Sequence, residues 1–134
     1  MEHFEFVIVG AGCAGLAVGR ELANACYSEK VLIIDEKQQF DNDKSWSFWA
    51  TDTSPWFQLA PYHWQYSSLS SGDQQELLNY SEHRYCMLPA LDYYRYCVDQ
   101  LTDNIELRLN NAVNQITCDL SEQCYPYKIT LANN

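Results

Sequence analysis

The sequence has few basic residues and no long apolar run. Its 8 lysines and arginines stand against 18 acidic residues, which gives a formal net charge of −10. This charge repels nucleic acids and anionic lipids, so we expect no nucleic-acid partner. No segment approaches about 18 consecutive apolar residues, the length that a membrane-spanning helix needs. These absences argue against nucleic-acid-binding and membrane-spanning proteins and favour a cytoplasmic location.

Cysteine and histidine pairs of the kind that bind zinc are also missing. None of the 6 cysteines belongs to a Cys-x-x-Cys or Cys-x-x-x-Cys pair, and no His-x-x-x-His pair occurs. Because the cysteines are scattered without paired spacing, we predict reduced thiols and no metal site. The histidines His3, His63 and His83 form no pattern typical of a catalytic triad, and we expect them to be surface or structural residues.

The composition is that of one globular domain. With 134 residues, 47% of them hydrophobic and 19% charged, the chain is long enough to bury an ordinary core. It contains no internal repeat and no low-complexity tract. We therefore expect residues 1–134 to form a single domain.

Residues 4–36 have the pattern of a strand–helix–strand unit. Phe4 to Val9 is an apolar, β-branched run that ends at Gly10, which predicts a parallel strand buried on both faces. Residues 13–26 carry apolar side chains about every 3.6 residues, which predicts a helix. Residues 31–34 are all apolar and predict a second strand that ends at Asp35. A unit of this order and of about 30 residues is typical of dinucleotide-binding folds.

A glycine-rich turn joins the first strand to the helix. Its sequence, Gly10-Ala11-Gly12-Cys13-Ala14-Gly15, has the G-x-G-x-x-G spacing. Gly10 allows the tight turn, Gly12 lets the backbone approach a diphosphate, and Gly15 lets the helix pack close to the strand. The phosphates then meet the positive end of the helix dipole and its N–H groups. We predict that this turn holds the pyrophosphate of a dinucleotide cofactor such as FAD or NAD.

An acidic residue follows the turn at the expected distance. Asp35 comes 20 residues after Gly15, at the strand end where a carboxylate accepts hydrogen bonds from ribose hydroxyls. Glu36 is its neighbour, and because side chains alternate along a strand, only one of the two can face the ribose. We choose Asp35. An acid here disfavours NADP, because it repels the 2′-phosphate.

The segment that follows, residues 36–61, changes from polar to aromatic and is interpreted as a connection. Its central sequence, Asp43-Lys44-Ser45-Trp46-Ser47-Phe48-Trp49, has two interpretations. Aromatic side chains most often form a hydrophobic plug in the core, and the residues alone favour this interpretation. The alternative interpretation is that these aromatic side chains line a binding site for a flavin or an apolar substrate.

The remaining sequence predicts two hairpins, a helix and a strand. One hairpin consists of residues 65–69 and 75–80 around a turn at residues 70–73, and the other of residues 113–118 and 127–131 around residues 121–124. Between them we predict a helix over residues 91–101 and a strand over residues 105–109. The fold class is α/β, a Rossmann-like FAD/NAD(P)-binding fold with an antiparallel β-hairpin addition, incomplete because no closing helix follows.

Three segments in order resemble the FAD-dependent lycopene β-cyclases of bacterial carotenoid synthesis. They are FEFVIVGAGCAGLAVGREL, then VLIIDEK followed by NDKSWSFW, and then RYCMLPALDYYRYCVDQL. Many flavoproteins have the first, whereas the Trp-Ser-Phe-Trp element shortly after the second strand is the most specific. The resemblance covers nearly the whole chain but only the N-terminal third of the family, so it identifies residues 1–134 as an N-terminal FAD-binding domain.

The resemblance implies a net non-redox reaction in which the ψ-end groups of lycopene close into β-ionone rings. It implies FAD, held reduced with NAD(P)H as reductant, and peripheral association with the inner face of the membrane, where carotenoids reside. FAD contacts are implied at Gly10, Ala11, Gly12, Cys13, Ala14, Gly15, Asp35, Glu36 and Val113. Substrate-lining positions are implied at Trp46, Phe48 and Trp49.

No catalytic acid is assigned. Asp43, Glu82 and Asp92 lie near these segments, but none of them matches a proton-donor motif. Two alternatives stay open: another FAD-dependent oxidoreductase or monooxygenase, and a non-catalytic nucleotide-binding remnant.

Overall fold

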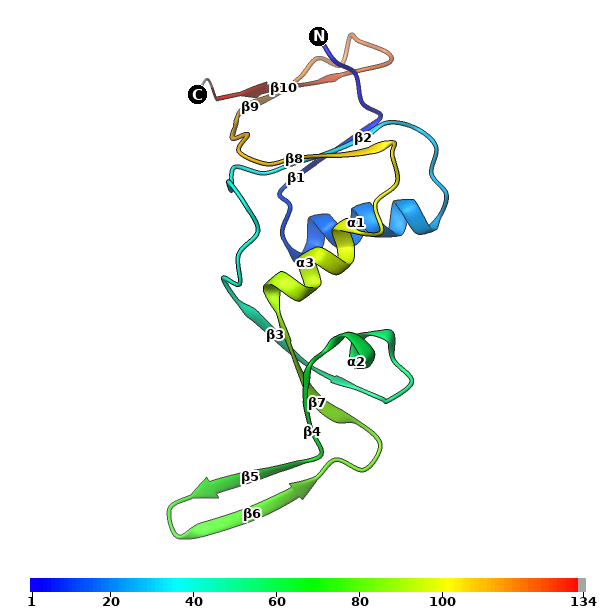
Figure 1. Ribbon diagram of the computed structural model, residues 1–134. Helices are drawn as coiled ribbons and strands as arrows, with labels where there is room; N and C mark the ends of the chain where they lie inside the picture. Colours follow the sequence, from blue (N-terminus) through cyan, green and yellow to red (C-terminus); the bar gives the residue numbers. More distant parts are fainter. Residues whose placement is uncertain (133–134) are drawn as a thin grey trace. The chain divides into compact units, whose positions relative to one another are not determined.

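The computed structural model describes residues 1–132, which fold into two compact units (Figure 1). The first unit comprises residues 1–40 together with the chain from Tyr94 onward, and the second comprises Asp41–Tyr93. The boundary at residues 93 and 94 falls inside helix α3 (Ala90–Val98). No helix in the described part of the chain has the length and apolar character needed to cross a bilayer.

The first unit is built on a parallel three-stranded sheet. Its strands are β1 (Phe6–Val9), β2 (Val31–Ile34) and β8 (Ile105–Arg108), in the order β1-β2-β8. Helix α1 (Cys13–Asn24) connects β1 to β2, and both neighbours of β2 run parallel to it. The predicted strand–helix–strand unit is therefore confirmed, as is the predicted strand at residues 105–109, which is one residue shorter.

The burial of β1 differs from the prediction. The sequence predicts a strand buried on both faces, and this is wrong, because Phe6 and Val9 are 48% and 51% exposed. Among the described residues β1 pairs only with β2, so it lies at an edge of the sheet. All four residues of β2, which has a partner on each side, are buried.

The first unit has three layers, with helix α1 on one side of the sheet and a hairpin on the other (Figure 1). The hairpin strands β9 (Val113–Cys118) and β10 (Tyr127–Leu131) pair antiparallel, with a register shift between Thr130 and Leu131. Both strands have the predicted bounds. The buried residues of this unit include Ala11, Leu16, Ala23, Val31, Leu32, Ile33, Ile34, Tyr94, Cys97 and Ile105.

The second unit contains a three-stranded antiparallel sheet that the sequence analysis did not predict. Its strands are β3 (Ser45–Ala50), β7 (Arg84–Pro89) and β4 (Tyr62–Trp64), in the order β3-β7-β4, and helix α2 spans Pro55–Leu59. The interpretation of residues 36–61 as a connection is therefore wrong for β3 and α2. The alternation of serine with aromatic residues in Ser45–Phe48 was the available signal. The buried residues of this unit include Ala50, Ala60, Cys86, Leu88, Ala90 and Tyr93.

The hairpin of β5 (Tyr66–Ser71) and β6 (Gln74–Asn79) was predicted from its turn. Gly72 has a φ of +59° at the first position of a two-residue turn, where type II′ geometry favours glycine. The strand ends lie within two residues of the predicted ones. Helix α3 is likewise confirmed, but it ends at Val98 instead of Leu101.

Helix α1 ends two residues before the predicted Cys26, because Cys26 adopts a left-handed conformation with a φ of +54°. The Cys26 amide donates to the Ala23 carbonyl and the Tyr27 amide donates to the Leu22 carbonyl, both at 3.0 Å. This is the hydrogen-bond pattern of a Schellman motif, in which glycine is the preferred residue at the left-handed position. Cys26 is exposed, so it gains no core packing that offsets the strained backbone.

We expect Cys26→Gly to stabilise the protein by about 0.5–1 kcal/mol, because glycine adopts this conformation without the steric penalty of a Cβ. The measurement is the free energy of unfolding in urea. Cys26→Ala is the matched control, since it removes the thiol and keeps the Cβ. Equal stabilisation by both substitutions would show that the backbone conformation is not the cause.

Candidate functional site

The first glycine of the turn occupies a conformation that other residues rarely adopt. Gly10 follows β1 with a φ of +107°, and its amide donates to the Ile34 carbonyl at 2.7 Å. A side chain at this position would strain the backbone. Gly10 therefore allows the chain to leave β1 sharply while it stays hydrogen-bonded to the end of β2.

Two further glycines let helix α1 approach the sheet. A Cβ on Gly15 would overlap the Gly10 carbonyl oxygen and lie 3.2 Å from Ile8 Cγ2. A Cβ on Gly19 would lie 2.5 Å from Ile33 Cδ1, which is closer than real Cβ contacts. The packing role was predicted for Gly15 but not for Gly19. Its position four residues later, on the same helical face, was the available signal.

Gly12 faces open space at the N-terminus of helix α1. A Cβ at this position would meet no atom within 4 Å, although the residue itself is half-buried. Gly12 is the N-cap, its carbonyl accepts a 3.0 Å hydrogen bond from the Leu16 amide, and no side chain caps the helix. The first N–H groups of a helix lack acceptors within the helix and attract anions. The open space beside Gly12, at the N-terminus of α1, thus has the room and the hydrogen-bond donors that a pyrophosphate needs.

Asp35 ties the glycine turn to the end of β2. Its carboxylate accepts a 2.6 Å hydrogen bond from the Ala11 amide at Oδ2 and a 2.9 Å bond from the Lys37 amide at Oδ1. Its own amide donates to the Arg108 carbonyl at 3.0 Å. The neighbouring Glu36 is exposed. Of the two acids, Asp35 is thus the one whose carboxylate contacts the turn, while its role toward a ribose stays a prediction.

The loop after Asp35 is held by groups that the sequence analysis did not single out. The Lys37 ammonium lies 4.8 Å from the ring centroid of buried Tyr94 and 5.4 Å from that of Phe40, within cation–π range. The Lys37 carbonyl accepts a 2.8 Å hydrogen bond from the Asn110 amide, and the Asp35 carbonyl accepts one of 3.0 Å from the Asn111 amide. The loops after β2 and β8 are therefore bonded to each other.

The remaining residues assigned to FAD lie near these loops. Cys13 and Ala14 are exposed at the start of α1, and Ala11 is fully buried. Val113 begins β9 directly after the loop that contains Asn111, where it is half-buried and pairs with Leu131. The adenine contact of Val113 stays a prediction.

The three aromatic residues assigned to the substrate divide between the two faces of β3. Trp46 and Phe48 are half-buried, and Trp46 lies 5.0 Å from the Tyr93 ring. Trp49 points to the other face, 5.0 Å from the Tyr85 ring, and is exposed. These residues belong to the second unit, and their substrate role stays a prediction.

Within the described chain, the three histidines and the acids near these segments lie apart from any catalytic triad. His3, His63 and His83 are all on the surface, where His63 packs against Phe57 at 4.6 Å between ring centroids. Within residues 1–132, no group of His, Cys, Asp and Glu side chains could hold a metal ion. Asp43 forms an ion pair with Lys44 at 3.4 Å, Glu82 is exposed and Asp92 lies in the first turn of α3.

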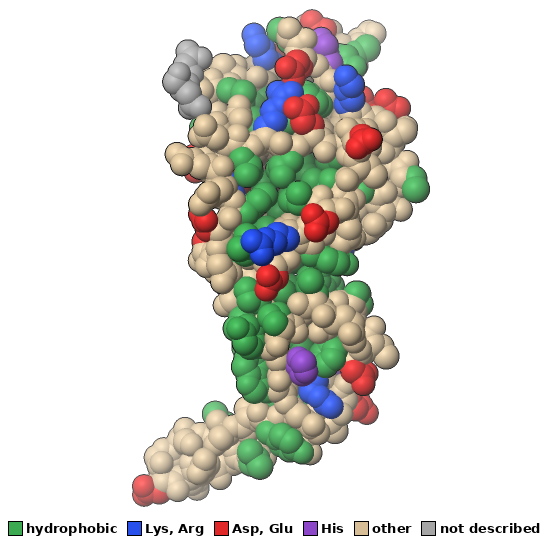
Figure 2. Space-filling model, viewed as in Figure 1, with side chains coloured by type: hydrophobic (Ala, Val, Ile, Leu, Met, Phe, Trp, Pro, Cys, Tyr) green, Lys and Arg blue, Asp and Glu red, His purple; other side chains and the backbone are tan. Residues whose placement is uncertain are grey.

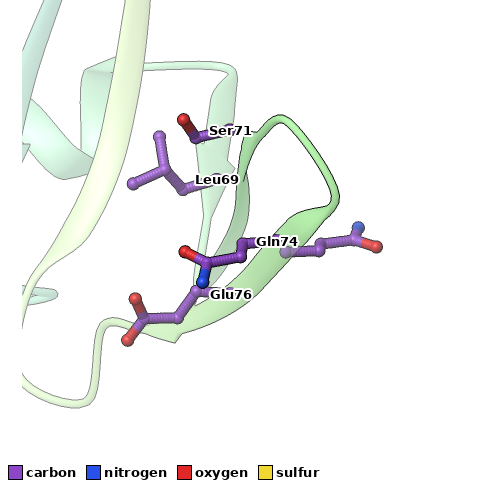
Figure 3. Close-up of a pocket in the computed structure, with 5 residues that line it drawn as sticks. Leu69, Ser71, Gln74 and Glu76 are labelled. Carbon is purple, nitrogen blue, oxygen red and sulfur yellow. The ribbon is translucent and has the colours of Figure 1, made fainter.

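Two surface pockets are lined by residues outside the glycine turn. One, on the β5–β6 hairpin, is lined by Leu69, Ser71, Gln74, Gln75 and Glu76 and has no basic group for a phosphate (Figure 3). The other contains Arg108, whose guanidinium bonds to both Glu106 and Glu2. These bonds raise the pKa of Arg108 and pair its charge with two carboxylates.

A family model described as lycopene cyclase protein matches residues 5–125. No curated protein matches the chain. Many solved structures are similar in fold, and three of them illustrate the similarity. PqsL from Pseudomonas aeruginosa, a probable FAD-dependent monooxygenase, has a TM-score of 0.65 and 10% identity over 90% of this chain and 36% of that chain.

The other two are similar to the same extent. The p-nitrophenol 4-monooxygenase PnpA from Pseudomonas putida DLL-E4 has a TM-score of 0.66 and 16% identity over 89% of this chain and 35% of that chain. The halogenase PltM in complex with phloroglucinol and FAD has a TM-score of 0.63 and 18% identity over 99% of this chain and 32% of that chain. The chain therefore has the fold of the corresponding part of FAD enzymes and spans about a third of their length.

Proposed function

Because the chain belongs to the lycopene cyclase protein family, whose model matches residues 5–125, we propose that it is the FAD-binding portion of a lycopene β-cyclase. Its first unit is a Rossmann-like FAD-binding fold, and the reaction is the net non-redox closure of the ψ-end groups of lycopene to β-ionone rings. Since the chain spans about a third of the solved structures it resembles, this activity is proposed for the whole enzyme.

The observation that carries the proposal is the glycine turn together with Asp35. The turn leaves open space above Gly12 at an uncapped helix N-terminus, and the Asp35 carboxylate is fixed beside it by two backbone N–H groups. These are the groups that bind the pyrophosphate and the ribose of a dinucleotide.

Each group has a separate role in holding FAD. The N–H groups at the start of α1 would donate to the pyrophosphate, with the helix dipole adding to the attraction. An ionised carboxylate has about four acceptor positions, so Asp35 can accept from the ribose hydroxyls in addition to its two backbone donors. Val113 would contact the adenine, and Glu36 would lie at the edge of the site.

FAD, kept reduced by NAD(P)H, would supply the electron density that stabilises a cationic transition state. In the proposed reaction a proton adds to a terminal double bond, a carbon–carbon bond closes the ring, and loss of another proton restores neutrality. Product and substrate therefore have the same mass. We infer a cytoplasmic location with peripheral access to the membrane that contains the substrate.

The test of the proposed function is the mass of the product formed from lycopene by cells that express the chain joined to the remaining two thirds of a lycopene cyclase. Cyclisation gives a product of unchanged mass, which chromatography separates from lycopene. The fold similarity to the monooxygenases PqsL and PnpA supports one alternative, whose product would be heavier by an oxygen atom. A chain that forms no product and gains no thermal stability from FAD would be a remnant.

A further inference from the structure

One face of the β3-β7-β4 sheet presents aromatic rings in a single line. The strand register pairs Trp49 with Tyr85 and Tyr85 with Trp64, so these side chains lie in one row across three strands. Their ring centroids are 5.0 and 6.1 Å apart, and the Tyr80 ring contacts Trp49 edge to face, with centroids 4.3 Å apart. We call Tyr80, Trp49, Tyr85 and Trp64 the aromatic row.

The aromatic row lies on the exposed face of this sheet. Trp49, Tyr85 and Trp64 are 51%, 37% and 45% exposed, whereas Cys86 and Leu88, which point to the other face, are buried. Exposed aromatic side chains in a contiguous patch are typical of ligand or partner sites. Figure 2 shows hydrophobic side chains at the surface of the second unit.

The same face carries no charged side chain along its strands. The residues that share it with the row are Ser45, Ser47, Tyr62, Met87 and Pro89. Arg84 belongs to the opposite face, and its guanidinium donates to the Tyr80 carbonyl at 2.8 Å. A neutral face is compatible with an uncharged ligand, and the net charge of −10 opposes an anionic lipid surface.

The row also has the shape of an elongated ligand. It crosses three strands at about 4.8 Å per strand, so its rings, which are tilted by 36° to 74° between neighbours, form a narrow apolar line of ring faces and edges. A polyene is long, uncharged and conjugated, and its flat π-system can lie along such a line of rings. Trp46 and Phe48 cannot join this surface, because they lie on the other face of β3.

We propose that the aromatic row receives the polyene chain of the carotenoid substrate. This assignment rests on the proposed cyclase function and selects Trp49 among the three predicted substrate residues. It adds Tyr85, Trp64 and Tyr80, which the sequence analysis did not connect with the substrate.

The test is sedimentation of the chain with phosphatidylcholine vesicles that contain lycopene or lack it. We expect the wild-type chain to sediment preferentially with lycopene vesicles. Tyr85→Ser removes the central ring of the row and is expected to weaken this binding about tenfold. Tyr85→Phe keeps the ring and is expected to retain it. The matched control is Leu77→Ser on β6, because Leu77 is 70% exposed and lies outside the row.

Each outcome separates this inference from the proposed function when FAD-induced thermal stabilisation is measured on the same samples. Equal sedimentation with both kinds of vesicle would overturn the inference in favour of a lipid surface. Unchanged lycopene binding by Tyr85→Ser, with FAD stabilisation intact, would overturn the inference and leave FAD binding standing. A dimer seen by analytical ultracentrifugation and abolished by Tyr85→Ser would assign the row to a second copy of the chain. Lycopene binding that Tyr85→Ser weakens, in samples that FAD does not stabilise, would support the assignment of the aromatic row and contradict FAD binding.

Discussion

Replacing Gly15 with alanine is expected to destabilise the first unit by about 3 kcal/mol, at the upper end of the usual range for overpacking. The new Cβ would overlap the Gly10 carbonyl oxygen and press on Ile8 Cγ2 at 3.2 Å. Ile8 lies in β1 and Gly10 directly follows it, and Gly10 is held in place by its hydrogen bond to Ile34. Relief therefore requires α1 to move away from the sheet. The free energy of unfolding in urea measures the effect.

Gly12→Ala is the matched control, since it adds the same methyl group three residues earlier. Its Cβ would meet no protein atom within 4 Å, and its φ of −84° is allowed for alanine. We expect stability to fall by less than about 1 kcal/mol, the usual range for an N-cap change. The methyl group would instead occupy the space predicted for the pyrophosphate, so FAD-induced thermal stabilisation should be lost. A Gly15→Ala variant that is as stable as Gly12→Ala would contradict the close packing of α1 on β1.

The sequence predicted the first unit well because its signals are local. Continuous apolar runs identify β1 and β2, and the glycine spacing identifies the turn between β1 and α1. In the second unit, the turn residues around Gly72 predicted the β5–β6 hairpin for the same reason. What the local pattern could not show is the number of partners that each strand has, which is why the burial of β1 was predicted wrongly.

The sheet of the second unit escaped prediction because its pairing is not local. Trp49 of β3 pairs with Tyr85 of β7, which lies 36 residues later in the chain. An aromatic segment with mixed spacing identifies neither strand nor partner by itself. Once β3 is known, alternation along the strand separates Trp46 and Phe48 from Trp49.

The sequence predicted residues for the candidate site, whose binding roles stay predictions, but it did not predict the hydrogen bonds that hold them. The choice of Asp35 over Glu36 came from the end of the apolar strand, and the contacts of Asp35 are with backbone N–H groups that no sequence pattern displays. The cation–π contacts of Lys37 depend on Tyr94, which lies 57 residues away in the chain. Asp35 thus has a structural role in addition to its predicted role in ribose binding, and the two can be measured separately.

Asp35→Ala is expected to weaken FAD binding at least about tenfold, because charge-assisted hydrogen bonds to the ribose are each worth about 1.5–3 kcal/mol. It should also lower the free energy of unfolding by about 1–3 kcal/mol, because the Ala11 and Lys37 amides lose their acceptor. Asp35→Asn keeps the shape of the side chain and one acceptor oxygen. Its free energy of unfolding should therefore lie between those of the wild type and Asp35→Ala. FAD titration followed by thermal unfolding gives both quantities.

Glu36→Ala is the control for Asp35, because it removes the adjacent carboxylate from an exposed position. We expect this variant to keep its stability and nearly all of its FAD affinity. ADP should stabilise the wild-type chain, and ADP with a 2′-phosphate should stabilise it less, since the Asp35 charge repels that group. Asp35→Asn should reduce this discrimination, whereas Glu36→Ala should preserve it. If Glu36→Ala instead abolishes the discrimination and Asp35→Asn does not, the ribose contact belongs to Glu36, and the Asp35 carboxylate serves only to hold the glycine turn.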